Sequence, residues 1–140
     1  MRGATIIAAL FFAGCISPHQ AVVTNVDLRS WCDSAVVVLH NTDTTALRDL
    51  SVIVRFNHQF TRTALPLTIA TRTPQGVRYG EPFTLPIQHT RAVAARSCEL
   101  VIPYRRSVVL QEVGDYHIVI TPREEVQGIE AIGINIEKSK

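Results

Sequence analysis

The sequence contains few of the residues from which long helices are built. It has one Met, aromatic residues make up 6% of its 140 positions, and long runs of Ala, Leu, Glu and Lys are absent. The β-branched residues Val, Ile and Thr dominate instead, and these suit pleated, half-buried surfaces. We therefore expect an all-β chain.

Neither sign of charge is in large excess. The chain has 14 Lys and Arg against 12 Asp and Glu, a net charge of +2, and its longest basic cluster is Arg105-Arg106. Nucleic-acid-binding domains carry clustered Lys and Arg on one face. The charge pattern therefore argues against a nucleic-acid partner.

Sequence signatures of catalysis and of metal binding are also missing. The five His residues show no His-x-His or His-x-x-x-His spacing, there is no Cys-x-x-Cys, and no Gly-x-Ser-x-Gly elbow or phosphate-binding Gly-rich loop occurs. Glu124-Glu125 are adjacent carboxylates whose side chains usually point apart. We expect no metal, no cofactor and no enzymatic activity, although catalytic residues scattered along a chain would escape this test.

The first fifteen residues carry the clearest signal. Arg2 precedes an apolar run over 6–12, which is followed by Ala13-Gly14-Cys15. A short basic segment, an apolar segment and small residues before a cleavage site are typical of a secretory signal, and the run is too short to span a bilayer. A Cys directly after Ala-Gly resembles a bacterial lipobox, in which the thiol accepts fatty acyl chains such as palmitate. An ordinary signal with a chance Cys, or a buried strand, is the alternative.

This pattern predicts the domain organisation and the location. We expect a lipoprotein signal peptide over 1–14, a tether over 15–21 and one β-sandwich domain over 22–140. Acylation of Cys15 would anchor the protein to a membrane of the cell envelope. The absence of acidic residues after Cys15 favours the periplasmic side of the outer membrane.

Two further cysteines, Cys32 and Cys98, remain for the domain. In an oxidising compartment they can form a disulfide if the fold brings their Cα atoms within about 7 Å. Two separate buried thiols are the alternative.

Alternating hydrophobicity and turn residues predict eight or nine strands, which indicates a single antiparallel β-sandwich, jelly-roll-like, of about eight strands. In 49–57 the residues Leu50, Val52, Val54 and Phe56 share one face, and the final strand should be an outer strand with one wet face. The expected strands cover 21–28, 35–40 (buried on both faces), 49–57, 65–72, 81–87, 98–103, 107–111, 116–121 and 129–138. The segment 92–95 is the only one that could turn helical.

The order of these motifs resembles the gliding-motility lipoprotein GldH family of the Bacteroidota. The resemblance covers about 31–138 and is most specific at Gly114-Asp115-Tyr116, Gly128-Ile129 and Ile132-Gly133. The chain departs from the family pattern at Pro122-Arg123 and over 89–96. The resemblance implies an envelope lipoprotein with a role in gliding motility or an associated secretion apparatus.

Because signatures of catalysis and of metal binding are missing, we expect the function to be binding. Tyr79, beside Gly76, Arg78 and Gly80, is the best candidate for an exposed aromatic contact, and Arg62 and Arg123 are further candidate partner contacts. The first hypothesis is a non-enzymatic interaction subunit that docks onto other envelope proteins. The alternative is a ligand-binding module, most plausibly for carbohydrate. A docking protein should show an exposed apolar patch or an unprotected sheet edge, whereas a glycan site should gather two or three exposed aromatics with polar neighbours.

Overall fold

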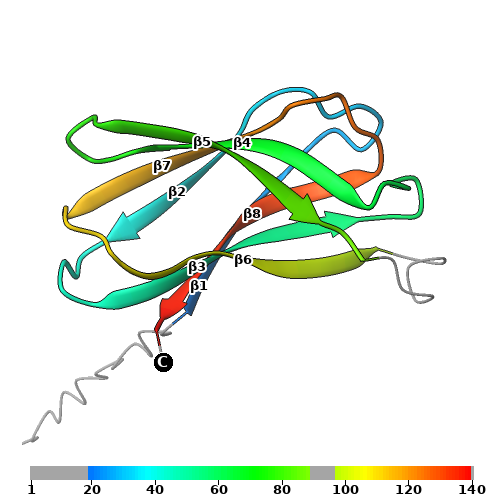
Figure 1. Cartoon of the computed structure of the whole chain (residues 1–140). Coiled ribbons are helices and arrows are strands. Elements are labelled where there is room, and N and C mark those ends of the chain that lie inside the picture. The colour runs from blue at the N-terminus through cyan, green and yellow to red at the C-terminus, as the bar shows by residue number, and fades with distance from the viewer. Residues whose placement is uncertain (1–18, 89–96, 140) are drawn as a thin grey trace, which may run out of the picture.

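The computed structural model describes residues 19–88 and 97–139, which form two antiparallel four-stranded sheets packed as a sandwich (Figure 1). The first sheet has the order β1-β8-β3-β6 and the second the order β2-β7-β4-β5. The strands are β1 (His19–Asn25), β2 (Ala35–Asn41), β3 (Leu47–Phe56), β4 (Ala64–Arg72), β5 (Arg78–Pro86), β6 (Cys98–Val109), β7 (Gly114–Pro122) and β8 (Ile129–Lys138).

The strand order is that of a jelly roll. Strand β4 pairs with β5, β3 with β6, β2 with β7 and β1 with β8, all antiparallel. The chain is thus one long hairpin with β4 and β5 at its tip, and this hairpin is wound so that successive pairs fall in alternate sheets. The all-β, jelly-roll-like sandwich predicted from the sequence is confirmed.

Period-2 patterning explains the core. Leu50, Val52, Val54 and Phe56 of β3 are buried, as are Tyr116, Ile118 and Ile120 of β7. These inward-facing residues of the two sheets interdigitate to form one hydrophobic cluster, which also contains Trp31. None of the described residues form a helix of the length and apolarity that a bilayer crossing needs.

The expected strands differ from those observed in four respects. Strand β1 begins at His19, so it extends into the expected tether, and β5 begins at Arg78 rather than 81. Strand β2 alternates between buried and exposed residues because only one of its faces meets the other sheet. The expected strands 98–103 and 107–111 are one strand, β6, whose register to β3 shifts near Leu50 and whose Ser107 has a φ of 53°.

Strand β8 is the fourth correction, because it lies in the middle of its sheet between β1 and β3. Ile132, Ile134 and Ile136 face the core as the alternation predicts, but the opposite face is not wet. The backbone of β1 passes so close to Gly133 that a Cβ there would lie 2.7 Å from the Val23 Cα. Position 133 is therefore covered by backbone, which the alternation of side chains did not reveal. The expected segment 92–95 lies outside the described residues.

All connections fall at two ends of the sandwich. At one end, called the near end, β1 begins, β8 ends, and the β2–β3, β4–β5 and β6–β7 connections lie close together (Figure 1). The β1–β2, β3–β4 and β7–β8 connections lie at the opposite end, called the far end. Hydrogen bonds tie the near end together. The Gln75 N–H donates to Glu112 Oε1 over 3.0 Å, and the buried Asn41 amide donates to the carbonyls of Leu110 and Glu112.

Candidate functional site

A groove lies between the edge strands β5 and β6, which belong to different sheets and do not pair with each other. We call this the open side of the sandwich. Its volume is about 650 Å3, in the range of small-molecule and side-chain binding sites. The register places Tyr79 and Glu81 of β5 opposite Thr71 and Ile69 of β4, on the side that faces the other sheet. The lining residues are Leu50, Ile69, Thr71, Arg78, Tyr79, Gly80, Glu81, Tyr104, Arg105, Val108 and Leu110.

The groove has an apolar floor and a polar wall. Leu50 and Ile69 reach it from the core, and Val108 and Leu110 come from the end of β6 and the residues after it. The Tyr79 side chain is 64% exposed at its mouth, the largest exposed fraction among the exposed hydrophobic residues of the described chain. The surface thus offers apolar area to a partner without being filled by the protein's own side chains.

The polar wall is built around Glu81. Its carboxylate accepts hydrogen bonds from the Tyr104 hydroxyl and from the Arg105 guanidinium, which also lies 5.0 Å from the Tyr104 ring centroid. The bond from Tyr104 is the main cause that holds the pKa of Glu81 below its ordinary value. Burial, followed by the bond to Glu81, raises the pKa of the Tyr104 hydroxyl.

These protonation states limit the chemistry of the groove. A general acid at neutral pH needs a raised carboxyl pKa, whereas Glu81 is held in the ionised form. No His lines the groove, and no group of three or more His, Cys, Asp and Glu side chains suited to a metal ion occurs within 19–88 and 97–139. The groove thus presents an ionised carboxylate beside its apolar surface.

Both strands that border the groove are protected against pairing with another strand. Pro82 and Pro86 of β5 lack an N–H, and because they are four residues apart their nitrogens lie on the same side of the strand. Strand β6 carries Pro103 and the irregular stretch at Ser107. Addition of a further strand is therefore disfavoured at both borders of the groove.

The three predicted contact residues are not brought together. Tyr79 lies in the groove near one end of the sandwich, whereas Arg62 and Arg123 lie at the far end. Arg62 pairs with Glu124 over 2.7 Å, and the Arg123 guanidinium donates to Thr84 Oγ1 over 3.0 Å. Both arginines connect loops to neighbouring elements, a role that sequence alone did not indicate.

A second hollow, of about 510 Å3, lies at the far end among Arg29, Gln59, Phe60 and Arg62. Its surface is mostly polar, and its nearby carboxylates are engaged: Glu124 by Arg62 and Glu125 by the Ser30 hydroxyl. This hollow offers little apolar area, so the groove is the better candidate.

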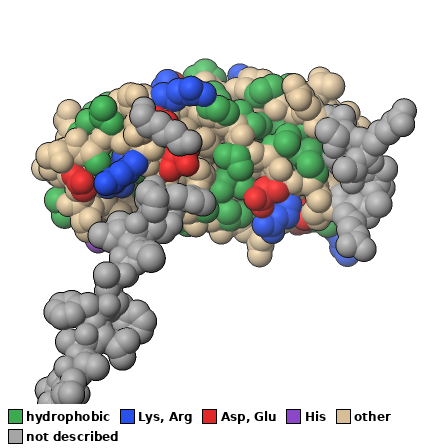
Figure 2. All heavy atoms as spheres, turned by 90° about the horizontal axis from the view of Figure 1, so that it is seen from below, with side chains coloured by type: hydrophobic (Ala, Val, Ile, Leu, Met, Phe, Trp, Pro, Cys, Tyr) green, Lys and Arg blue, Asp and Glu red, His purple; other side chains and the backbone are tan. Residues whose placement is uncertain are grey.

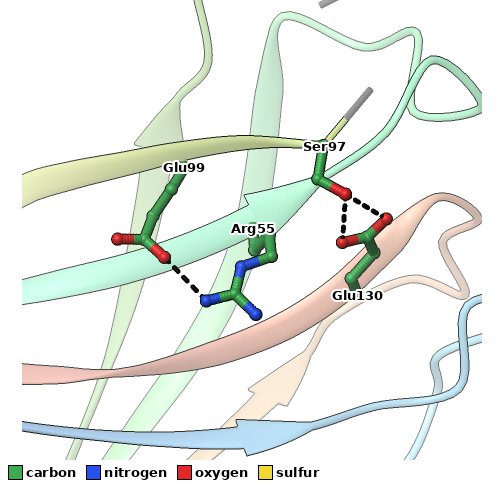
Figure 3. A network of polar contacts seen from close by, with 4 residues as sticks. All are labelled: Arg55, Ser97, Glu99 and Glu130. Carbon is green, nitrogen blue, oxygen red and sulfur yellow. Dashed lines mark hydrogen bonds and ion pairs between the residues drawn. The ribbon is translucent and has the colours of Figure 1, made fainter. Parts of the chain in front are cut away.

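The outer face of the first sheet carries the remaining polar network (Figure 3). Arg55 of β3 pairs with Glu99 of β6 over 2.9 Å, and the Ser97 hydroxyl donates to Glu130 over 2.6 Å. Exposed pairs of this kind contribute at most about 1 kcal/mol. Figure 2 shows hydrophobic side chains among charged ones on this side of the molecule.

The other predicted site residues have different outcomes. Cys15 lies outside the described residues. Cys32 is exposed and Cys98 half-buried, and both thiols are free. Cys32 adjoins the bridge between Trp31 and Val126, while Cys98 pairs with Phe56 at the start of β6, so the structure does not join them in a disulfide.

Groove residues other than Tyr79 were missed. The expected strands 98–103 and 107–111 left Tyr104 and Arg105-Arg106 in the connection between them. The signal that could have found the site is the pairing of β4 with β5 and of β3 with β6, which brings residues 50, 79 and 104 to one side of the sandwich.

No family model and no curated protein sequence matches the chain. Among solved structures, the chain is similar to one from the infectious bursal disease virus Gx strain, with 9% identity and a TM-score of 0.39, covering 86% of this chain and 32% of that one. It is also similar to dimeric latent PorU from Porphyromonas gingivalis, with 10% identity and a TM-score of 0.34, covering 86% of this chain and 13% of that one. The chain thus spans about a third or less of either neighbour.

Proposed function

We propose that this protein is a lipid-anchored, non-enzymatic interaction subunit of a bacterial cell envelope. The observation that supports this role best is the groove between β5 and β6, where an exposed Tyr79 stands above an apolar floor. Exposed apolar surface of this kind marks sites of interaction, and Tyr is enriched among the residues that dominate binding energy. The ionised Glu81 adds a hydrogen-bond acceptor to this surface.

The chemistry of the groove suggests the kind of contact. Its floor accepts an aliphatic or aromatic side chain, and Arg78 at its rim has no hydrogen-bond or ion-pair partner among residues 19–88 and 97–139. An apolar side chain next to a carboxylate on the partner protein would satisfy both features. The lipobox-like Ala13-Gly14-Cys15 supports the anchor, and the resemblance to the GldH family supports a gliding-motility or secretion apparatus as the assembly.

A crosslinking pulldown of the tagged protein from its native envelope tests this function. We expect envelope proteins to be recovered with the natural chain and lost with Tyr79→Ser, while Val101→Ser, which changes another exposed hydrophobic residue outside the groove, should retain them. Cys15→Ala should lose them by loss of the anchor. Recovery of the same proteins with Tyr79→Ser would show that the groove is not the docking site.

A carbohydrate ligand is the second candidate. It is favoured by the position of Tyr79 and Tyr104 in the same groove as Arg78 and Glu81, because a tyrosine ring can stack on a sugar while polar neighbours bind its hydroxyls. Binding of the purified protein on a glycan array, lost in Tyr79→Ser and accompanied by an empty pulldown, would favour this function over docking.

A further inference from the structure

The exposed hydrophobic residues of the described chain are not spread evenly over the molecule. Five of nine lie at the near end, on or beside the β2–β3, β4–β5 and β6–β7 connections. They are Leu47, Val77, Tyr79, Val109 and Val113. Loop tips in solution are ordinarily polar, so apolar tips that come from three separate connections require a partner.

The charged side chains at the near end differ in whether they have partners within the protein. Two of its carboxylates accept hydrogen bonds from within the protein: Asp49 from the Ser107 N–H and the Ser139 hydroxyl, and Glu112 from the Gln75 N–H. Arg72 and Arg78, in contrast, have no hydrogen-bond or ion-pair partner among the described residues. They lie directly opposite each other on β4 and β5, a placement of like charges that an external anion would relieve.

The position of Cys15 in the chain indicates which partner the near end would contact, namely a membrane. Cys15 precedes His19 by four residues, which can span at most about 14 Å. His19 pairs with Glu137, and the Ser139 N–H donates to the Leu47 carbonyl over 3.0 Å, so β1 begins two strands away from Leu47. Adjacent strands lie about 4.8 Å apart. An acylated Cys15 would therefore hold the start of β1, at the near end, close to the membrane surface.

We propose that the near end is a membrane-contacting surface, on which Leu47, Val77 and Val113 enter the headgroup region and Arg72 and Arg78 meet lipid phosphates. This inference rests on the proposed acylation of Cys15. Apolar side chains flanked by Arg are the pattern by which proteins lie on a bilayer interface. The groove then opens sideways, close to the lipid surface, and the far end points away from the membrane.

The test uses the full acylated protein, purified from its host and reconstituted in vesicles of phosphatidylethanolamine and phosphatidylglycerol with brominated acyl chains. Bromine quenches Trp emission only within contact range. Val77→Trp probes the near end, and Val36→Trp is the matched control, since both valines are 46% exposed and Val36 lies close to the far end. The natural Trp31 is buried at the far end and gives the same background in both variants.

We expect the brominated lipid to quench the added emission of Val77→Trp and to leave that of Val36→Trp unchanged. Equal quenching of the two, or quenching of neither, would overturn the proposal. A change in the emission of Val77→Trp that depends on protein concentration and not on bromine would indicate that a second copy of the protein covers this end. That result would also overturn the proposal. Mass spectrometry of the N-terminal peptide reports acylation separately: without it both proposals fail, whereas acylation without quenching removes only the membrane contact.

Discussion

At the scale of single residues, Glu81 is an unusual carboxylate because it faces the interior side of an edge strand. Its bonds to Tyr104 and Arg105 connect the edge of one sheet to the edge of the other. The Phe83 and Tyr104 rings reinforce this connection, with centroids 4.9 Å apart in an edge-to-face arrangement. Glu81 therefore contributes to holding the two sheets together on the open side, where no backbone pairing does.

The lowered pKa of Glu81 predicts a pH-dependent stability. A carboxyl whose folded pKa is depressed stabilises the folded state above its unfolded pKa of about 4.3, and this contribution is lost as the pH falls. We expect the free energy of unfolding of the natural protein to fall more steeply between about pH 5 and pH 3 than that of Glu81→Gln. Urea unfolding at several pH values measures both.

This comparison isolates Glu81 from the other carboxyls. Hydrogen bonds also hold the pKa of Asp43 and of Asp49 below the ordinary value, chiefly from Thr45 and Ser139 respectively. Both variants retain these groups, so their contribution cancels in the difference. Parallel pH profiles of the two proteins would contradict the prediction.

Gly76 and Gly128 have the same φ but different surroundings, so alanine substitutions at these positions distinguish backbone strain from packing. Gly76 and Gly128 both have a φ of 90°, but a Cβ at Gly76 would meet no atom within 4 Å, whereas one at Gly128 would lie 2.7 Å from the Gln59 carbonyl carbon and closer still to the Phe60 nitrogen. Gly76→Ala should cost about 1–2 kcal/mol from the left-handed conformation alone. Gly128→Ala should cost at least about 2 kcal/mol more, because backbone atoms must move.

Equilibrium urea unfolding of the two alanine variants checks this pair. Equal losses of unfolding free energy would contradict the prediction. They would mean that the backbone around Gly128 moves to admit the Cβ without a loss of stability. The sequence signalled Gly128 only as one position of the resemblance, since the contact with Phe60 joins residues far apart in the chain and cannot be inferred from either local pattern.

At the scale of elements, the alternation was predicted well in β3 and β7, whereas the burial of β2 and β8 and the continuity of β6 were not. The alternation in β3 and β7 identified their inward residues because one face of each meets the core. The alternation in β8 was correct for the isoleucines but could not show that β1 covers Gly133. The polar stretch Tyr104-Arg105-Arg106 suggested a turn, whereas register shifts keep it within β6 as an edge strand.

The edge prolines give a prediction at this scale. Pro82→Val with Pro86→Val restores two N–H donors along the outer side of β5, and an unprotected edge invites pairing between molecules. We expect the double variant to form oligomers at concentrations where the natural protein does not. Light scattering coupled to size-exclusion chromatography measures the difference.

Thr68→Val is the matched control for the edge prolines. It adds a valine on the neighbouring strand β4, directly opposite Pro82, without freeing a backbone donor. If this control associates as strongly as the double variant, added surface hydrophobicity is the cause rather than the open edge.

At the scale of the whole molecule, the sequence predicted the class of fold and the compactness of one domain but not the strand order. Which strands become edges decides where the groove lies, and that depends on pairings between residues 50 or more positions apart, such as Leu50 with Arg105. Tyr79 was predicted correctly as an exposed aromatic from its local turn. Tyr104 and Arg105 on the other side of the groove could not be predicted, because they belong to the other sheet.

The free thiols predict that no cross-link supports the fold. We expect the urea midpoint of the Cys15→Ala protein to be the same with and without reductant. Two thiols should react with a thiol reagent under native conditions, Cys32 quickly because it is exposed and Cys98 slowly because it is half-buried. A midpoint that falls on reduction would reveal a disulfide between them.

The placement of β1 has a mechanical consequence. Force that pulls on the chain ahead of His19 while the far end is held runs along the length of β1, which is joined to β8 through seven residue pairs. Backbone hydrogen bonds of an antiparallel pair lie perpendicular to the strands, so this load shears all of them together instead of opening them one at a time. If Cys15 is acylated as proposed, β1 is thus placed to carry tension between the membrane and the far end of the sandwich.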